Sequence, residues 1–452
     1  MRRPRLRGRH SPRAARDPVE TAVGQIPVEL GIERLLPGGL GLGHHAGVTF
    51  LVPFTAPGDR IEMVVQRVGK GVGRGTMLSL LEPGPGRISP PCRHFGRCGG
   101  CQLLHLDPAT QAAAKEGFVT DSLRRIGRLS PPSPPDPIVT PEPRLGYRRR
   151  AGIKIRWVGD RPLIGFFAAN SHRVIDLEEC PVLHPRLSRL LGPMRELVQG
   201  LDARRGVPQC DLLAGEAATG MVWHFLLTPD DQDRRRLLCF AEAQGVDQLW
   251  IQVGRRSGLQ PLRAAAGLHY MVADLALAYG PGEFTQAHFE GNRLLVAEAM
   301  AMMQGACGPI GDLFSGIGNF TLPLAGAFPR VIGLESHPGA VARAGANARA
   351  HGLDPTFRQG DLAAPEVVAE MLEEIGEGAI LMDPPREGAV VVARGLAASR
   401  VRRVISVACD PATFARDAAI LVHGGFHLER LRLFDLFPGT HHVELAALFR
   451  RR

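Results

Sequence analysis

The sequence predicts an α/β protein in which a C-terminal doubly wound sheet follows two β-rich segments. Three observations lead to this prediction. From about residue 285 onward, apolar strands alternate with helical stretches, which is typical of an open parallel sheet. The first of these strands runs into a glycine-rich turn, Ser315-Gly-Ile-Gly, and acidic residues end two others. Residues 20–83 and 146–280 instead show short strands bounded by turn residues.

Length and charge limit the class of protein. A chain of 452 residues is too long for one ordinary core, so we expect roughly two to four domains. The net charge of +9 favours a polyanionic partner, with nucleic acid as the leading candidate, although a GC-rich genome also produces an excess of arginine. No apolar run reaches the roughly 18 residues of a membrane span, so we expect a cytoplasmic protein without a membrane partner.

Residues 1–19 form the most basic part of the chain. Seven arginines and no acidic residue lie among the first 16 positions. Organellar transit peptides share such a composition, but no clear apolar face accompanies it here. We therefore expect a disordered basic arm that contacts phosphates.

Residues 20–84 are expected to fold into a small five-stranded β-barrel of the OB type. Strands are predicted at Ile26-Pro-Val-Glu-Leu and Val48-Thr-Phe-Leu-Val-Pro-Phe, with a flexible hairpin at Gly38-Gly-Leu-Gly-Leu-Gly between them. The stretch "GIERLLPGGLGLGHHAGVTFLVPFTAPGDRIEM" resembles a TRAM domain, a module of RNA-modifying enzymes. This resemblance implies contact with RNA, and a generic β-barrel is the alternative.

Residues 85–284 are expected to form a β-rich central domain, in which Ala151–Val158 alternates apolar and polar side chains like a strand. A helix is predicted over Ala109–Arg128, and the segment 105–129 is a candidate to pack on the C-terminal domain. The proline-rich residues 130–143 predict an extended linker.

Three cysteines of the central domain have the spacing C-x5-C-x2-C: Cys92, Cys98 and Cys101. Intervening glycines let this short loop fold its thiolates around one centre. As the fourth ligand, the best candidate is Cys180, which lies in a polar turn before a proline. Four thiolates hold either zinc or an iron–sulfur cluster, and the spacing does not choose between them. Three scattered cysteines are expected in the core: Cys210, Cys239 and Cys307.

In the C-terminal domain, residues 285–452, four predicted strands end in residues that can bind or react. A G-x-G turn follows the first strand, Glu335 and Asp383 end the next two, and Cys409 follows the fourth. Because the carboxyl ends of parallel strands meet at one sheet edge, we expect these groups to lie together. The turn is neither a P-loop nor a complete dinucleotide fingerprint. Together with an acid that accepts hydrogen bonds from both ribose hydroxyls, it indicates a site for S-adenosylmethionine.

Cys409 and Glu444 are the predicted nucleophile and base. Asp410 should cap a helix directly after Cys409, so we expect the helix N-terminus to favour a thiolate. A thiolate added to C6 of uracil makes C5 nucleophilic toward a methyl sulfonium, and a base must then remove the C5 proton. Glu444 lies between Val443 and Leu445, and this apolar setting is expected to raise its pKa.

Together these segments resemble the RNA uracil-C5 methyltransferases, above all the iron–sulfur members that modify 23S ribosomal RNA. The resemblance covers nearly the whole chain from about residue 20 and depends on "CRHFGRCGGC", "DLFSGIGNF", "DPPREG", "ACDPATFARD" and "HHVE". It implies a class I S-adenosylmethionine methyltransferase domain after the TRAM and iron–sulfur domains. We also expect a monomer that binds RNA, most simply 23S ribosomal RNA.

The resemblance assigns roles to individual residues. It implies that a [4Fe-4S] cluster is held by Cys92, Cys98, Cys101 and Cys180. It implies that S-adenosylmethionine is contacted by Gln286, Phe314, Asn319, Glu335 and Asp383, with Asp361 beside the adenine. It also implies Cys409 as nucleophile and Glu444 as proton acceptor, acting on a uridine that is flipped out of the RNA.

The chain departs from the family pattern in ways that leave more than one function open. Asp410 stands where Asn is usual, and its charge opposes a neighbouring thiolate. Thr285-Gln286-Ala287-His288 replaces the usual Phe-Gln-Val-Asn, and Ser315 replaces a frequent cysteine. A tRNA uridine-C5 methyltransferase would use the same chemistry. A non-catalytic iron–sulfur RNA-binding protein and a small-molecule methyltransferase are the remaining candidates.

Overall fold

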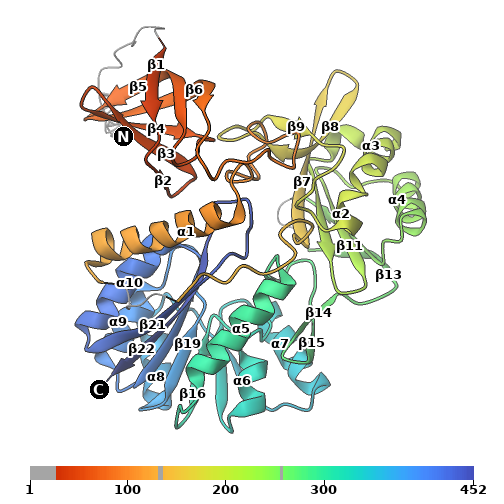
Figure 1. Ribbon diagram of the computed structural model, residues 1–452. Helices are drawn as coiled ribbons and strands as arrows, with labels where there is room; N and C mark the ends of the chain where they lie inside the picture. Colours follow the sequence, from red (N-terminus) through yellow and green to blue (C-terminus); the bar gives the residue numbers. More distant parts are fainter. Residues whose placement is uncertain (1–26, 131–135, 255–257, 452) are drawn as a thin grey trace, which may run out of the picture. The chain divides into compact units, whose positions relative to one another are not determined.

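The computed structural model describes residues 27–130, 136–254 and 258–451 (Figure 1). The predicted basic arm lies outside the described residues, as does part of the predicted linker. The chain divides into two compact units: the residues up to Leu35 with Leu40–Pro85, and Leu36–Gly39 with Gly86–Arg452. In the described ranges, no helix has both the length and the apolar character needed to span a membrane.

The first unit is a six-stranded sheet, whereas the sequence predicted five strands. Its order is β1-β5-β6-β4-β3-β2, and the β4–β6 pair is parallel. Strand β2 has only three residues, too few to show an alternating pattern in the sequence. Phe50, Ile61 and Met63 contribute to the small core of this unit. The strands are β1 (Val28–Gly31), β2 (Arg34–Leu36), β3 (Leu40–His45), β4 (Val48–Pro53), β5 (Arg60–Gly69) and β6 (Val72–Glu82).

The second unit contains two seven-stranded sheets. The central sheet has the order β13-β12-β11-β10-β7-β8-β9, and only its β11–β12 pair is parallel. Apolar side chains of α3 and α4 pack on one face of this sheet. Its strands are β7 (Arg150–Val158), β8 (Arg161–Phe167), β9 (Val174–Asp176), β10 (Gln209–Ala214), β11 (Thr219–Phe225), β12 (Gln248–Val253) and β13 (Gln260–Ala264). Its helices are α2 (Pro185–Ser188), α3 (Leu191–Gly200), η2 (Arg204–Gly206) and α4 (Asp231–Ala243).

The C-terminal sheet has the order β18-β17-β16-β19-β20-β22-β21. Strands β16 to β20 are parallel, and β22 runs antiparallel to both β20 and β21. The strands are β16 (Ile310–Leu313), β17 (Val331–Glu335), β18 (Thr356–Gln359), β19 (Ala379–Met382), β20 (Arg403–Ala408), β21 (Phe426–Phe434) and β22 (Glu444–Arg451). This is the doubly wound sheet that the alternation of strands and helices predicted.

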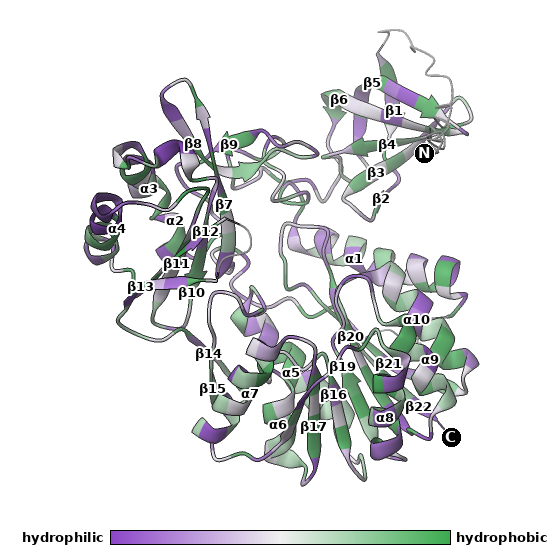
Figure 2. Ribbon diagram, turned by 180° about the vertical axis from the view of Figure 1, so that it is seen from behind, coloured by the Kyte–Doolittle hydropathy of each residue, from purple (hydrophilic) through white to green (hydrophobic). Residues whose placement is uncertain are grey.

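Helices cover both faces of the C-terminal sheet. One face packs on α5 (Phe289–Met303), α6 (Thr321–Ala327), α7 (Pro338–Ala350) and the hairpin of β14 (His269–Val272) and β15 (Leu275–Ala278). The other face packs on α8 (Pro365–Ile375), α9 (Val390–Ala398) and α10 (Pro411–His423). The sheet strands are correspondingly hydrophobic, whereas the outer side of α4 is hydrophilic (Figure 2).

Helix α1 (Pro108–Ser122) ends in a π-helical turn, η1 (Leu123–Gly127), and belongs to the C-terminal core although it precedes the central sheet in the chain. Its Val119 and Leu123 are buried in the same apolar cluster as Phe414 of α10 (Figure 1). The segment from α1 therefore connects the loop that carries the first three cysteines directly to the C-terminal domain.

Candidate active site

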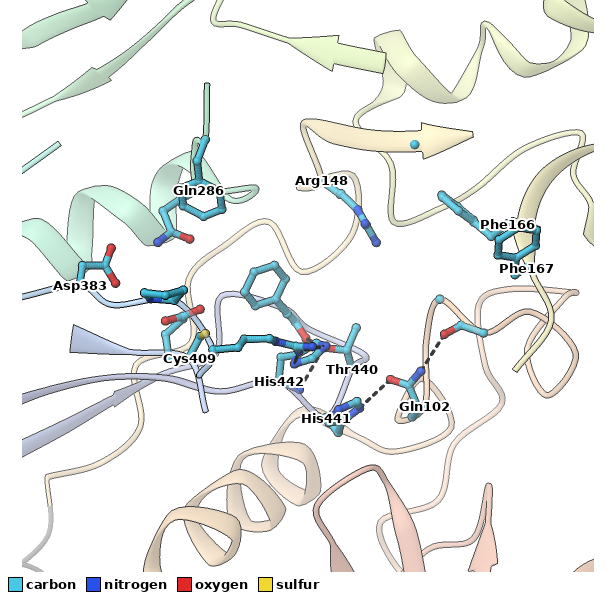
Figure 3. Close-up of a pocket in the computed structure, with 18 of the residues that line it drawn as sticks. Gln102, Arg148, Phe166, Phe167, Gln286, Asp383, Cys409, Thr440, His441 and His442 are labelled. Atoms are coloured by element: carbon cyan, nitrogen blue, oxygen red, sulfur yellow. Dashed lines mark hydrogen bonds between the residues drawn. The ribbon is translucent and has the colours of Figure 1, made fainter. Parts of the chain in front are cut away.

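A cavity of about 990 Å³ lies between the carboxyl edge of the C-terminal sheet and the central sheet (Figure 3). On the C-terminal side it is lined by six of the residues assigned from the sequence: Gln286, Phe314, Glu335, Asp383, Cys409 and Glu444. Four of them end or directly follow separate strands: Phe314, Glu335, Asp383 and Cys409. Gln286 lies in the loop before α5. The sheet topology therefore gathers residues that are more than a hundred positions apart in the chain.

The glycine-rich turn after β16 leaves its backbone open toward the cavity. Phe314, Gly316 and Gly318 all have positive φ angles, of 64°, 54° and 97°. Such a conformation in a phenylalanine costs about 1–3 kcal/mol and persists only where neighbouring structure enforces it. A Cβ atom at Gly316 would meet nothing within 4 Å, and Gly316 lines the cavity. The turn therefore offers a bare backbone cradle for a ligand.

Glu335 and Asp383 place two carboxyl groups beside this cradle. The Gly316 amide donates a hydrogen bond of 3.1 Å to Glu335 Oε2, and the His337 amide donates one of 2.8 Å to Oε1. Burial raises the pKa of Asp383 to about 7. Glu335 thus offers hydrogen-bond acceptors for hydroxyl groups, and a cationic ligand would favour the ionised form of Asp383.

Two residues assigned to the cofactor do not line the cavity. Asn319 exchanges hydrogen bonds with Asn292 of α5, at 2.8 and 3.0 Å, and its Oδ1 also accepts one from the Tyr270 hydroxyl. The exposed Asp361 accepts a hydrogen bond from the Ala363 amide at 2.9 Å and so closes the turn after β18. These hydrogen bonds tie Asn319 to α5 and β14, and its contact with the cofactor stays a prediction.

Cys409 lies in the turn between β20 and α10, as the sequence predicted. Asp410 caps α10 by accepting hydrogen bonds of 3.0 Å from the Ala412 and Thr413 amides. The expectation of a favoured thiolate is wrong for this state of the protein. Burial, and then the charges of Glu444 and Asp383, raise the pKa of the Cys409 thiol to about 12. Burial is the larger cause, and the two carboxyl groups, which come from other strands, add to it.

Glu444 begins β22, and its side chain is 3% exposed. Because β22 is antiparallel to β20, its first residue lies at the same sheet edge as the last residues of β20, and Ala408 pairs with Leu445. Burial, with a further contribution from Asp383, raises the pKa of Glu444 well above its usual value. This confirms the direction expected from its apolar neighbours.

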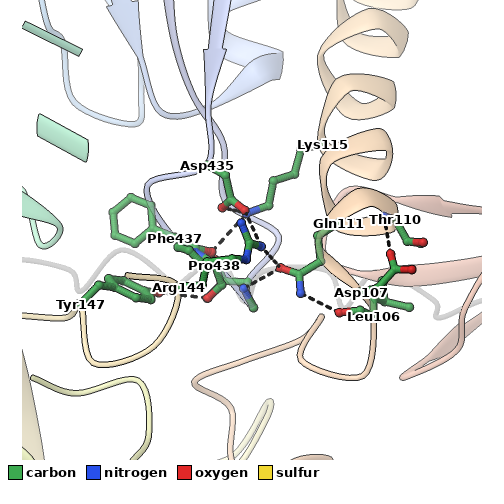
Figure 4. Close-up of polar contacts among 12 residues, drawn as sticks. Leu106, Asp107, Thr110, Gln111, Lys115, Arg144, Tyr147, Asp435, Phe437 and Pro438 are labelled. Carbon is green, nitrogen blue, oxygen red and sulfur yellow. Dashed lines mark hydrogen bonds and ion pairs between the residues drawn. The ribbon is translucent and has the colours of Figure 1, made fainter. Parts of the chain in front are cut away.

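A buried polar network holds the loop between β21 and β22, which leads into Glu444 (Figure 4). Lys115 of α1 is fully buried, pairs with Asp435 and donates a hydrogen bond of 3.1 Å to the Phe437 carbonyl. Arg144 donates to the second Asp435 oxygen at 3.2 Å. Gln111 accepts a hydrogen bond of 2.8 Å from the Gly439 amide. Two segments that precede the central sheet therefore fix a loop of the C-terminal domain.

The histidines of this loop reach into the cavity, and sequence reasoning gave them no role. Arg386 donates to the His442 ring at 2.7 Å, and burial lowers the pKa of His442 to about 3. His441 contacts Gln102 Oε1 at 3.1 Å, and Gln102 Nε2 donates to the Gly99 carbonyl at 2.9 Å (Figure 3). The "HHVE" motif was the available signal, although it did not reveal which partners the rings would meet.

The four clustered cysteines surround one small hollow beside the cavity: Cys92, Cys98, Cys101 and Cys180. Burial, and then the charges of the neighbouring thiols, raise the pKa of the Cys101 thiol to about 12. Among the described residues, no three of these sulfur atoms lie within 4.8 Å of one another. Of the cysteines predicted in the core, only Cys210 is buried, because Cys239 and Cys307 occupy exposed positions.

Comparison with known proteins identifies the family. The family model described as tRNA (Uracil-5-)-methyltransferase matches residues 126–452. The chain belongs to this family of RNA uracil-C5 methyltransferases. The 23S rRNA (uracil(1939)-C(5))-methyltransferase RlmD of Nitrosococcus oceani is 37% identical, covering 96% of this chain and 98% of the relative. RlmD of Pseudomonas aeruginosa is 38% identical, and the match covers 94% of this chain and 95% of the relative.

A solved structure shows the same fold. The crystal structure of Pyrococcus abyssi tRNA (uracil-54, C5)-methyltransferase, in complex with S-adenosyl-L-homocysteine, superposes with a TM-score of 0.71. It covers 93% of this chain and 99% of that chain at 23% identity. The arrangement of a class I methyltransferase domain after β-rich domains is therefore shared with another enzyme that acts on uracil C5 of RNA.

Proposed function

We propose that this RNA uracil-C5 methyltransferase uses S-adenosylmethionine to methylate C5 of a uridine in 23S ribosomal RNA, the base that corresponds to position 1939 of its relatives. The proposal depends on one observation above all. Cys409 and Glu444 face the same cavity as the bare glycine turn and Glu335. A nucleophile, a base and a place for a methyl donor thus share one cavity.

Cys409 and Glu444 divide the chemistry between them. Sγ of the Cys409 thiolate forms a bond to C6 of the uracil ring, and the electron pair of the C5–C6 double bond moves toward C5. C5 then carries enough negative character to accept a methyl group. Glu444 removes the proton from the methylated C5, the C6–Sγ bond breaks, and the ring double bond re-forms with release of the thiolate.

S-adenosylmethionine, when bound, supplies an electrophilic methyl group on a sulfonium. Glu335 would accept hydrogen bonds from the ribose hydroxyls, and the open backbone at Gly316 would let the nucleoside lie close to the turn. Gln286 and Phe314 line the same part of the cavity, and we propose them as further contacts. Asp383 would balance positive charge there.

The raised thiol pKa means that Cys409 is protonated in the free protein near neutral pH. Its proton must leave before Sγ can attack, and Arg386 is the cation that lowers the pKa of both Cys409 and Glu444. Because thiolate and carboxylate are both formed by deprotonation, the rate of methyl transfer should rise with pH through the neutral range.

We further propose that the cysteine hollow holds a [4Fe-4S] cluster rather than zinc. Four thiolates at about 2.3 Å from a single zinc ion must lie within about 4 Å of one another. Among the described residues, no three of these sulfur atoms meet the 4.8 Å limit, and this arrangement suits a centre in which each thiolate binds its own iron. The Gln102 contact joins this loop to His441, so the group would stabilise the wall of the cavity. Metal analysis and the absorption spectrum of anaerobically purified protein distinguish iron–sulfur from zinc.

Transfer of a labelled methyl group to defined RNAs tests the function. A fragment of 23S ribosomal RNA that contains the target uridine should be methylated, and the same fragment with cytidine at that position should not. Transfer RNA is the matched alternative substrate, and its preference over the ribosomal fragment would replace this proposal with the tRNA-directed one. A stable adduct with 5-fluorouridine RNA, in which fluorine blocks removal of the C5 proton, would exclude a non-catalytic binding protein.

A further inference from the structure

The central sheet supplies one wall of the cavity, and the charged side chains of this wall are cationic, whereas the catalytic edge carries carboxyl groups. Phe166 and Phe167 end β8, Lys154 lies in β7, and Arg148 lies just before β7, and all four line the cavity. The two phenylalanines lie across the cavity from Cys409 in Figure 3, and Arg148 points into the space between. This wall therefore combines aromatic rings with cations, whereas carboxyl groups surround the nucleophile.

Strand alternation explains how Lys154 comes to face the cavity. Ile153 and Ile155 are buried in the core under the helices of the central sheet. Successive side chains of a strand point to opposite faces, so Lys154 points away from that core. Its ammonium donates a hydrogen bond to Gln209 and lies 5.6 Å from the centre of the Phe167 ring. The strand thus holds a cation beside an aromatic face.

The cations of this wall have no carboxylate partner among the described residues, unlike their neighbours. Arg144 pairs with Asp435 and Arg149 with Glu216. Arg148 instead donates to the Arg150 carbonyl and lies 5.7 Å from the centre of the Phe166 ring. An unpaired cation in a cavity attracts an anion, and rings that line the same wall can stack on a planar group. A nucleotide offers both.

We propose that this wall is a second nucleotide subsite, in which an unpaired nucleotide next to the target uridine places its base on the Phe167 ring and its phosphate on Arg148 and Lys154. The inference rests on the proposed function, because it takes the ligand to be RNA. The cavity volume supports it, since about 990 Å³ is at the upper limit of the roughly 300–1,000 Å³ typical for one drug-sized ligand.

Two of the four residues allow the subsite to be tested without disturbing the cysteines. Arg148 and Phe166 also line the cysteine hollow, so their substitution would affect both places. Lys154 and Phe167 line only the large cavity. Phe167→Leu removes the ring, Phe167→Tyr keeps it, and Lys154→Gln removes the charge. Arg349→Gln removes the same charge from an exposed position on α7 and serves as the control.

Binding of a fluorescent ribosomal RNA fragment, measured by anisotropy, gives the readout. We expect Phe167→Leu to weaken binding about 10-fold and Phe167→Tyr to bind like the unaltered protein. Lys154→Gln should weaken binding and reduce the slope of log affinity against log salt by about one, whereas Arg349→Gln should leave affinity nearly unchanged. Unaltered binding of S-adenosylhomocysteine, measured by calorimetry, shows that each variant is folded. Equal RNA affinity for all four variants would overturn the subsite.

A series of abasic RNAs then locates the stacked nucleotide. At one position beside the target, loss of the base should weaken binding to the unaltered protein but add nothing to the loss in Phe167→Leu. If the effect of Phe167→Leu is the same at every abasic position, no base stacks there and the proposal fails. Binding is measured without methyl transfer. Protein that binds RNA through this wall but transfers no methyl group would therefore refute the proposed function and leave the subsite standing.

Discussion

The two walls of the cavity differ in charge, in origin and in how they are built. At the catalytic wall, Glu335, Asp383 and Cys409 lie together because each of them ends or directly follows a strand of one sheet. At the opposite wall, antiparallel strands of another sheet present Lys154 and Phe167. The acidic wall suits a cationic methyl donor, and the basic wall suits a polyanion. One cavity can thus accept two ligands of opposite charge without competition between them.

Replacement of the nucleophile should separate the two walls most clearly. We expect Cys409→Ala to reduce methyl transfer by on the order of 10⁴-fold or more, because no neighbouring thiol can attack C6. RNA affinity should be retained, since the basic wall is intact. The measurement is incorporation of labelled methyl groups together with RNA anisotropy, and Cys239→Ala, at an exposed cysteine that does not line the cavity, is the control. Retained activity in Cys409→Ala would refute covalent catalysis.

Substitution of the base should stop the reaction at a later point. Glu444→Gln keeps the shape of the side chain but cannot accept the C5 proton, so turnover should fall by about 10²–10⁴-fold. Sγ attack does not need this proton acceptor, and a covalent protein–RNA adduct should therefore accumulate with unmodified RNA. Denaturing gel electrophoresis detects the adduct. A variant that turns over slowly without any adduct would show that Glu444 acts before, rather than after, the C–S bond forms.

The network that joins α1 to the loop before Glu444 should contribute to the free energy of unfolding and hold the catalytic wall in place, without affecting the basic wall. Lys115→Met leaves Asp435 buried with Arg144 as its single ionic partner, which should reduce the free energy of unfolding by about 3 kcal/mol. Urea denaturation measures this loss, and Arg124→Met, at an exposed position of η1, is the matched control with an expected change below about 0.5 kcal/mol. Comparable losses in both variants would argue against a specific role for the pair.

The catalytic wall was predictable from sequence because its residues follow strands directly. Glu335, Asp383 and Cys409 each come at a strand end, where topology alone brings them to one edge. The error concerned the charge state of Cys409, since a local rule counts the helix N-terminus but neither the burial of the thiol nor the carboxyl groups from other strands. The hydrogen bond between Asn319 and Asn292 of α5 could not be read from the sequence either, and contact of Asn319 with the cofactor stays a prediction.

The basic wall and the buried network left no comparable signal. Lys154 reads as one polar residue of an alternating strand, and nothing in the sequence shows which face of the central sheet meets the cavity. Lys115 and Asp435 are 320 positions apart, so no spacing rule can pair them. In both places the function of a side chain depends on packing between distant segments, which periodicity does not encode.

The smallest expected effect tests the electrostatics of the catalytic wall. Asp410 is among the charges that raise the pKa of Cys409. Asp410→Asn removes this charge but keeps the helix cap, because asparagine caps as well as aspartate does. The thiol pKa should fall, and the rising limb of the pH–rate profile should move to lower pH by less than about one unit. Iodoacetamide alkylation of Cys409 against pH reports the thiol directly, and a shift to higher pH would show that Asp410 assists the thiolate.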